Sequence, residues 1–308
     1  MNIVTLLPSA TEIVCALGLQ GSLVAVSHEC DFPPEVTTRP KITSSLIPHD
    51  VSAHQIDQAV AEAIRRGEAL YQIDGDLLQT LQPDLIITQG LCDVCAVNAG
   101  TVQATMMFLP EVVAENVQVL SLSAQNFAGI LRDLDQVAQA TGSAPIAAQL
   151  RETLERRWQQ LQTTQPTTKP RVLMLEWPDP FFYGGHWVPE MVANAGGIDV
   201  IGQVGVDSGR CTLQDIQARD PDVIISIACG YGLEGNVELA QQLTAKPDFR
   251  ALRAVQNHNF WAMDANSYCS RPAPRIVDGA EKLQAIFNQV GQGVAGIERI
   301  QVGRFSSQ

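Results

Sequence analysis

The feature that most limits the fold of this chain is an alternation of short apolar runs with segments of helical periodicity. Each run is rich in branched aliphatic residues and has the length of a buried strand. Such alternation is typical of βαβ units, in which helices connect parallel strands of one sheet. We therefore expect an α/β fold with mainly parallel sheets. The expected strands lie at residues 3–7, 23–26, 85–88, 117–120, 172–175, 223–226 and 260–263, and clear helical patterns lie at 52–66 and 274–289.

The middle of the chain lacks this alternation and is predicted to connect two lobes. Residues 126–140 and 145–161 have the pattern of two consecutive helices with no strand between them. A chain of 308 residues also suits two domains of roughly 150 residues each. We expect an N-terminal lobe at 1–123, a connection with one long inter-lobe helix at 124–168, and a C-terminal lobe at 169–308. The long helix carries one apolar stripe, formed by Leu150, Leu154, Trp158 and Leu161.

A weak internal repeat favours two equivalent lobes. The segment LQPDLIIT at 81–88 is similar to RDPDVIIS at 219–226. Both are expected to form a helix end, a Pro-Asp turn and a buried strand. Pro-Asp turns before parallel strands also arise by chance, so the repeat alone leaves duplication open.

Composition and charge exclude several classes of protein. Hydrophobic residues make up 45% and charged residues 17% of the chain, which fits a folded globular protein and not a disordered one. The formal charge of -13 argues against nucleic-acid binding, because phosphate contacts require a basic face. No apolar run is long enough to span a membrane. An expected strand follows Met1-Asn2 directly instead of a secretory signal, so we expect a cytoplasmic protein, or a periplasmic one if a leader was removed.

In open α/β sheets, ligands bind at the carboxyl ends of the strands. The first expected strand is followed by PSATE at 8–12, in which Ser9 can cap a helix and Glu12 can complete a capping box. A capped helix explains this motif by itself, but N–H groups at a helix start also bind polar ligand groups. The next strand ends are followed by SHECD at 27–31 and QGLCDVC at 89–95. The candidate ligand contacts of the first lobe are Pro8, Ser9, Ala10, Thr11, His28, Glu29, Gln89 and Leu91.

Three cysteines of the first lobe predict a metal or redox site as an alternative. Cys30, Cys92 and Cys95 follow strand ends and can join His28 in a three-thiolate, one-imidazole site for zinc or iron. The C-x-x-C pair also suits dithiol redox chemistry. Buried, inert thiols explain the same residues, because a single C-x-x-C lacks the second pair of a strong zinc signature. The chain has seven cysteines, an odd set without framework spacing, so reduced thiols are expected.

Aromatic residues crowd a Gly/Pro-rich segment of the second lobe, WPDPFFYGGHW at 177–187. The segment has little helical or strand periodicity, so we predict an irregular loop whose rings stack on a flat ligand. CGY at 229–231 and DANSYC at 264–269 follow two further strand ends, and RPAPR at 271–275 introduces the last helix, with prolines suited to its first turn. The candidate ligand contacts of the second lobe are Trp177, Tyr183, His186, Trp187, Tyr231, Asn266, Tyr268 and Arg271.

The sequence carries no recognisable catalytic motif. It has no G-x-S-x-G elbow for a nucleophilic serine and neither a Walker loop nor a G-x-G-x-x-G dinucleotide fingerprint. A binding protein is therefore expected in preference to an enzyme.

Together, these segments resemble the substrate-binding proteins of ABC importers for cobalamin and iron-siderophores. The resemblance covers nearly the whole chain and is carried by LLPSATEI at 6–13, PDLI at 83–86, the long helix near 145–161 and RPAPRIVD at 271–278. SHEC at 27–30, LCDVCAV at 91–97 and GHWVPE at 185–190 look like a subgroup described as cobalamin-binding. The resemblance implies a clamshell of two Rossmann-like lobes, a shallow cleft lined by aromatic residues, an ABC permease as partner, and no catalysis.

The leading hypothesis is a protein that binds cobalamin or a related metal chelate in the cleft between its lobes. Large, flat, partly apolar ligands fit aromatic clefts that also carry a few placed polar groups. The alternative is a Cys/His site for zinc, iron or an iron–sulfur cluster, or a dithiol redox protein, on the same fold. His28 or His186 can also ligate the metal of a tetrapyrrole from its open axial side.

Overall fold

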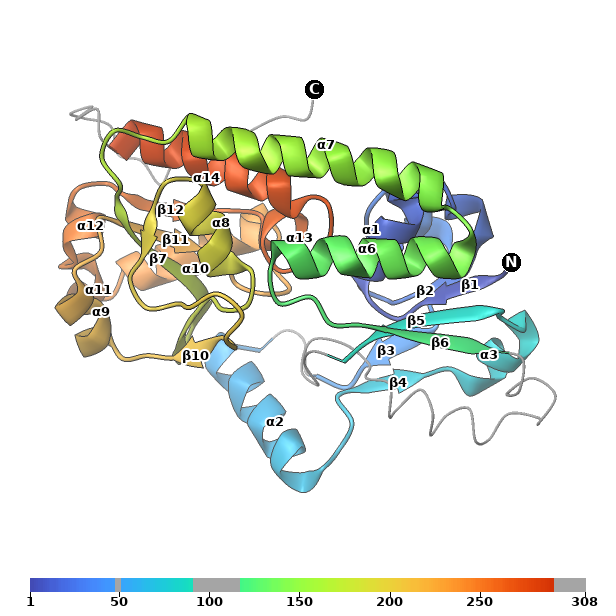
Figure 1. Ribbon diagram of the computed structural model, residues 1–308. Coiled ribbons are helices and arrows are strands. Elements are labelled where there is room, and N and C mark those ends of the chain that lie inside the picture. Colours follow the sequence, from blue (N-terminus) through green and yellow to red (C-terminus); the bar gives the residue numbers. More distant parts are fainter. Residues whose placement is uncertain (48–50, 91–116, 291–308) are drawn as a thin grey trace. The chain divides into compact units, whose positions relative to one another are not determined.

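The computed structural model describes residues 1–47, 51–90 and 117–290 (Figure 1). The chain divides into two compact units. Unit 1 consists of Met1–Ala124 and Ala128–Glu152, and unit 2 of Gln125–Phe127 and Thr153–Gln308. Each unit has its own mainly parallel sheet, so the expected α/β class is confirmed.

Unit 1 is built on a fully parallel sheet with strand order β2-β1-β5-β6. The inner strands β1 and β5 are buried along their whole length, as expected for parallel strands covered on both faces. A separate antiparallel pair, β3 and β4, shares a hydrophobic core with this sheet through Ile42 and Tyr71. The elements of unit 1 before the connecting helices are β1 (Ile3–Thr5), α1 (Pro8–Ala16), η1 (Gln20–Ser22), β2 (Leu23–Val26), η2 (Pro34–Thr38), β3 (Thr43–Ser45), α2 (Ala53–Arg66), β4 (Tyr71–Ile73), α3 (Gly75–Leu81), β5 (Leu85–Gln89) and β6 (Gln118–Leu122).

Two consecutive helices, α6 (Phe127–Thr141) and α7 (Ala144–Thr163), occupy the predicted connection. Their existence and their order without an intervening strand are confirmed. Helix α7 begins in unit 1 and ends in unit 2, with the boundary between Glu152 and Thr153. Within unit 2, Arg157 of α7 binds Asp278 and Glu281 at 2.5 and 2.6 Å, which ties the end of α7 to helix α14 (Ile276–Val290).

Unit 2 is built on a sheet of order β10-β8-β7-β11-β12, with β9 also paired to β7. Strands β7, β9, β11 and β12 are parallel, and β8 and β10 add an antiparallel edge. Alternation along β7 directs Leu173 and Leu175 into the core with helices α9 to α12. The remaining elements are β7 (Arg171–Pro178), β8 (Phe181–Tyr183), α8 (Val188–Asn194), β9 (Ile198–Asp199), β10 (Gly209–Arg210), α9 (Leu213–Arg219), β11 (Val223–Ser226), α10 (Leu233–Thr244), α11 (Pro247–Arg250), α12 (Arg253–Gln256), β12 (Phe260–Ala262) and α13 (Ala265–Tyr268).

The aromatic segment of unit 2 is not the irregular loop that its sequence predicts. Strand β7 continues to Pro178, the chain turns at residues 179–180, and β8 returns antiparallel with Trp177 opposite Phe182. The prediction of an irregular loop is wrong because strands this short, interrupted by prolines, give almost no period-2 signal. Because successive side chains of a strand point to opposite faces, the hairpin divides its rings between two faces: Trp177 and Phe182 are paired on one, and Phe181 and Tyr183 pack into the core on the other.

Candidate functional site

The start of α1 lies directly after β1 and carries an unusual buried hydroxyl. The N-cap is Leu7, whose side chain caps nothing, and Pro8 opens the first turn. The predicted capping box of Ser9 and Glu12 is therefore wrong: Ser9 lies inside the helix, two positions after the N-cap residue. Ser9 is 2% exposed, and its Oγ has no hydrogen-bond partner in the described part of the chain. A buried hydroxyl without a partner costs about 1–3 kcal/mol, and such groups often mark functional sites.

A line of hydroxyl and thiol groups joins β1, α1 and the loop after β2. Thr5 Oγ1 lies 2.6 Å from Thr11 Oγ1, which in turn lies 3.0 Å from Cys30 Sγ. All three side chains are buried. Thr11 and Cys30, which follow neighbouring strands of the sheet, are thus close together.

The predicted three-thiolate site falls mainly outside the described residues. Leu91, Cys92 and Cys95 belong to the stretch 91–116, which the structure does not describe. Within residues 1–47, 51–90 and 117–290, no group of three or more His, Cys, Asp or Glu side chains is arranged to hold a metal ion. The site formed by His28, Cys30, Cys92 and Cys95 therefore stays a prediction.

His28 follows β2 and is held by a hydroxyl group of β3. Thr43 Oγ1 accepts the backbone N–H of His28 at 3.0 Å and lies 2.7 Å from Nδ1. The same hydroxyl donates its proton to Ser27 Oγ at 3.2 Å. Nε2 faces Glu29 Oε1 at 4.0 Å. The ring is thus held through Nδ1, with a carboxylate near its other nitrogen.

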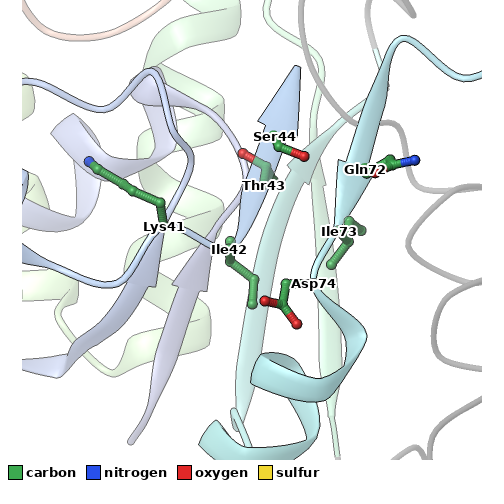
Figure 2. A pocket seen from close by; sticks show the side chains of 7 residues that line it. All are labelled: Lys41, Ile42, Thr43, Ser44, Gln72, Ile73 and Asp74. Carbon is green, nitrogen blue, oxygen red and sulfur yellow. The ribbon is translucent and has the colours of Figure 1, made fainter. Parts of the chain in front are cut away.

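Unit 1 also contains a pocket of about 300 Å³ on the small β3–β4 sheet (Figure 2). Asp74 belongs to its wall and caps α3 by accepting the Leu77 N–H at 2.9 Å. The Lys41 ammonium donates to the Cys30 carbonyl at 2.9 Å, which links the pocket to the loop after β2. None of the predicted ligand contacts lines this pocket, so sequence reasoning did not find it. The lining residues are Lys41, Ile42, Thr43, Ser44, Gln72, Ile73 and Asp74.

In unit 2, an aromatic pair lies at the carboxyl ends of β7 and β11. The ring centroids of Trp177 and Tyr231 are 5.9 Å apart with an interplanar angle of 55°, and both side chains are half-buried. Burial raises the pKa of the Tyr231 phenol. A side chain at Gly235 of α10 would come within 2.6 Å of the Tyr231 ring, so glycine is needed for this ring to pack on the helix. Two separately predicted contacts are therefore neighbours in the structure.

Asn236 positions the loop that carries Tyr231, and sequence reasoning missed it. Its side chain is fully buried. Oδ1 accepts from Ser226 Oγ at 3.1 Å and from the Ala228 N–H at 2.6 Å. Nδ2 donates to the carbonyls of Tyr231 at 3.0 Å and Gly232 at 3.2 Å. One amide thus holds both sides of the loop after β11. Asn236 lies inside helix α10, where the sequence alone gives no signal of this role.

The loop after β12 joins the same region. Asp264 caps the short helix α13 by accepting from the N–H and hydroxyl of Ser267. The Asn266 N–H donates to the Tyr231 carbonyl at 3.4 Å, so the loops after β11 and β12 are in contact. Tyr268 lies under the Lys282 ammonium at 4.6 Å, and burial raises the pKa of its phenol. Arg271 is also buried, at 9% exposure.

His186 and Trp187 form a stacked pair before α8, with ring centroids 5.6 Å apart. Trp187 is 6% exposed and its Nε1 donates to the Cys269 carbonyl at 2.7 Å, so this indole is part of the unit 2 core. His186 has a left-handed backbone (φ 53°) and donates its N–H to the Val206 carbonyl at 2.7 Å. Burial lowers the pKa of His186, while Asp207, 3.7 Å from Nδ1, opposes the shift.

The remaining predicted contacts have less distinctive surroundings. Tyr183 points to the core face of β8 and packs against the main cluster of unit 2, whereas Gln89 ends β5 and is buried. In unit 2 the structure brings together Trp177, Tyr231 and Asn266, and in unit 1 it brings together Thr11 and Cys30. That the two groups act on one ligand stays a prediction.

Comparison with known proteins identifies the family. The sequence profile of the periplasmic binding protein family matches residues 3–267. The chain belongs to the periplasmic binding protein family. Its two α/β units with mainly parallel sheets fit the fold of this family.

Individual members show how distant the relationships are. A vitamin B12-binding protein of Vibrio cholerae is 24% identical over 285 residues, which cover 92% of this chain and 87% of the relative. An uncharacterized ABC transporter substrate-binding lipoprotein of Bacillus subtilis is 22% identical over 294 residues, covering 92% and 78%. The solved structure of a periplasmic heme-binding protein from Roseiflexus, in its apo form, superposes with a TM-score of 0.70 at 22% identity, covering 94% and 99%.

The sequence predicts that no segment of this chain spans a membrane, and the helices of the structure bear on this prediction. Among the helices in the described ranges, none is both long and apolar enough to cross a membrane.

Proposed function

We propose that this chain is the substrate-binding protein of an ABC importer and that it binds cobalamin or a related flat metal chelate without catalysing a reaction. The observation that carries the proposal is the Trp177–Tyr231 pair at the carboxyl ends of β7 and β11. Parallel α/β sheets bind ligands at that edge, and half-buried aromatic rings offer stacking surfaces to flat ligands. The names of the relatives, a vitamin B12-binding protein and a heme-binding protein, support this ligand class.

In the proposed complex, unit 1 supplies polar contacts and unit 2 supplies the rings. Ser9 and the first-turn N–H groups of α1 are suited to an acceptor group of the ligand, because helix starts favour such groups. The imidazole of His28, held through Nδ1 by Thr43, is suited to the metal or to a polar group of the ligand. Joint use of both units by one ligand is part of the proposal.

The proposed partner is an ABC permease, and the proposed location is outside the cytoplasm. Both follow from relatives that are named a periplasmic protein and an ABC transporter lipoprotein. The cytoplasmic location expected from the first residues of the chain has no support among these relatives. We do not favour the Cys/His metal and dithiol alternatives, because the relatives are named for binding vitamin B12 and heme.

The test begins with a measurement of the metal content of the reduced protein. The protein is then titrated with cyanocobalamin and, in a separate experiment, with hemin, and binding is monitored by tryptophan fluorescence. Saturable binding of either ligand at micromolar or tighter affinity is expected. Trp177→Ala and Tyr231→Ala should each weaken binding about tenfold, because an aromatic contact is worth about 0.5–1.5 kcal/mol. Trp177→Phe is the matched control and should retain most of the affinity. Unchanged affinity in both alanine variants would show that the site lies elsewhere.

A further inference from the structure

A row of side chains crosses the antiparallel edge of the unit 2 sheet. Trp177 on β7 lies opposite Phe182 on β8, and Phe182 lies opposite Arg210 on β10. Directly paired residues share a face of the sheet, so Trp177, Phe182 and Arg210 lie on one face. The Trp177–Tyr231 contact extends the row to the loop after β11. Phe181 and Tyr183 point to the opposite face and pack in the core.

The row ends in a guanidinium group. The Cζ atom of Arg210 lies 5.3 Å from the centroid of the Phe182 ring, within the range of a cation–π contact. A side chain at the preceding residue, Gly209, would come within 2.3 Å of the Tyr183 hydroxyl. Glycine at this position therefore leaves room for the Tyr183 ring beside β10, and the pairing of β10 with β8 brings Arg210 over the Phe182 ring.

This arrangement combines two kinds of recognition. The rings of Tyr231, Trp177 and Phe182 suit the face of a flat, partly apolar ligand. The planar guanidinium of Arg210 has a fixed fork of donors that matches a carboxylate or phosphate group. Arg210 is exposed, whereas Phe182 is half-buried, so the charge lies at the solvent end of the row. That is where the charged edge of a stacked ligand would lie.

We infer that Arg210 determines specificity by binding an oxyanion, a carboxylate or a phosphate, at the edge of the flat ligand that stacks on this row. The inference rests on the proposed function, since it requires a ligand stacked on Trp177. It adds a requirement that the proposed function does not contain: the ligand carries an acidic group at its rim, and a neutral analogue of the same shape binds more weakly.

The experiment compares three probes on the intact chain: hemin, which has two carboxylates, its dimethyl ester, which has none, and cyanocobalamin, which has a phosphodiester. Wild-type protein should bind an acidic probe at least about tenfold more tightly than the ester, because hydrogen bonds to charged groups are among the stronger ones. Arg210→Met should abolish that preference and leave ester binding unchanged. Loss confined to hemin identifies a carboxylate site, and loss confined to cyanocobalamin identifies a phosphate site.

The control is Arg250→Met, which removes an equal charge from an exposed position on α11 of the same unit and should not alter the preference. Equal losses for hemin and its ester in Arg210→Met, or no loss for any probe, overturn the inference. If Trp177→Ala weakens binding and Arg210→Met does not, only the role of Arg210 is refuted. If the wild-type chain binds none of the probes, the proposed function and the inference are both refuted.

Discussion

Replacing Asn236 by alanine should remove the internal support of the loop that carries Tyr231. The side chain is 0% exposed and accepts the Ala228 N–H at 2.6 Å while donating to two carbonyls, those of Tyr231 and Gly232. Alanine would leave these backbone groups buried without that partner. Each such group costs about 1–3 kcal/mol, and partial hydration of the loop favours the lower half of the range. We expect the free energy of unfolding to fall by about 3–5 kcal/mol.

The assay combines urea denaturation with hydrogen exchange. Denaturation followed by circular dichroism should give the loss of stability, and exchange read by mass spectrometry should show faster exchange in residues 226–233 than in the rest of unit 2. Asn257→Ala is the matched control, because Asn257 is exposed at the end of α12 and should change stability by less than about 0.5 kcal/mol. A loss below about 1 kcal/mol in Asn236→Ala, with unchanged exchange, would refute the reasoning.

Three further changes give separate expectations. Burial lowers the pKa of His186 in the folded state below its ordinary value of 6.5, so its contribution to stability is complete above pH 6.5 and is lost as the pH falls through the folded pKa. Between about pH 7.5 and pH 5, the free energy of unfolding measured by urea denaturation should therefore fall less in His186→Asn, which also tolerates the left-handed backbone, than in the wild type. Gly185→Ala would place a Cβ 2.3 Å from the backbone nitrogen of Ser208, whereas the Cβ of Gly21→Ala would meet nothing within 4 Å. Thermal denaturation should show that Gly185→Ala lowers the free energy of unfolding by at least about 2 kcal/mol and that Gly21→Ala does not. Burial raises the pKa of both Cys15 and Cys211 to about 11. Alkylation of these two thiols near pH 8, measured by peptide mass spectrometry, should therefore be about a hundredfold slower in the folded than in the unfolded chain. Equal rates in the two states would contradict this expectation.

The buried parallel strands could be predicted from sequence because their apolar runs are uninterrupted. Strands β2 and β11 have the bounds that the sequence predicts, Leu23–Val26 and Val223–Ser226. Such strands are buried on both faces, so every residue carries the same signal. Strands β9 and β10, with two residues each, are too short to show any period, and their pairing is decided by the sheet beside them.

The candidate site was predictable only where a residue lies at the carboxyl end of a strand or in the loop that follows it. Trp177 and Tyr231 meet that condition, and the parallel register of β7 and β11 brings them together. Asn236 and Phe182 do not meet it. Asn236 acts from inside a helix through hydrogen bonds to a loop several residues earlier, and Phe182 depends on a hairpin whose register no local pattern specifies. Tertiary context, and not propensity, determines both positions.

The raised thiol pKa of three cysteines bears on whether these residues can bind a metal or exchange a disulfide. Metal ligation and dithiol exchange both require thiolates. Burial is the largest cause that raises the thiol pKa of Cys15, Cys211 and Cys269, and nearby carboxylates raise it further: Glu12 and Glu35 at the first, Asp215 at the second, Asp264 and Glu176 at the third. Near neutral pH these three thiols therefore stay protonated, and they are poorly suited to metal ligation or dithiol exchange. The aromatic row of unit 2, in contrast, is the set that the fold places at the edge where parallel sheets bind their ligands.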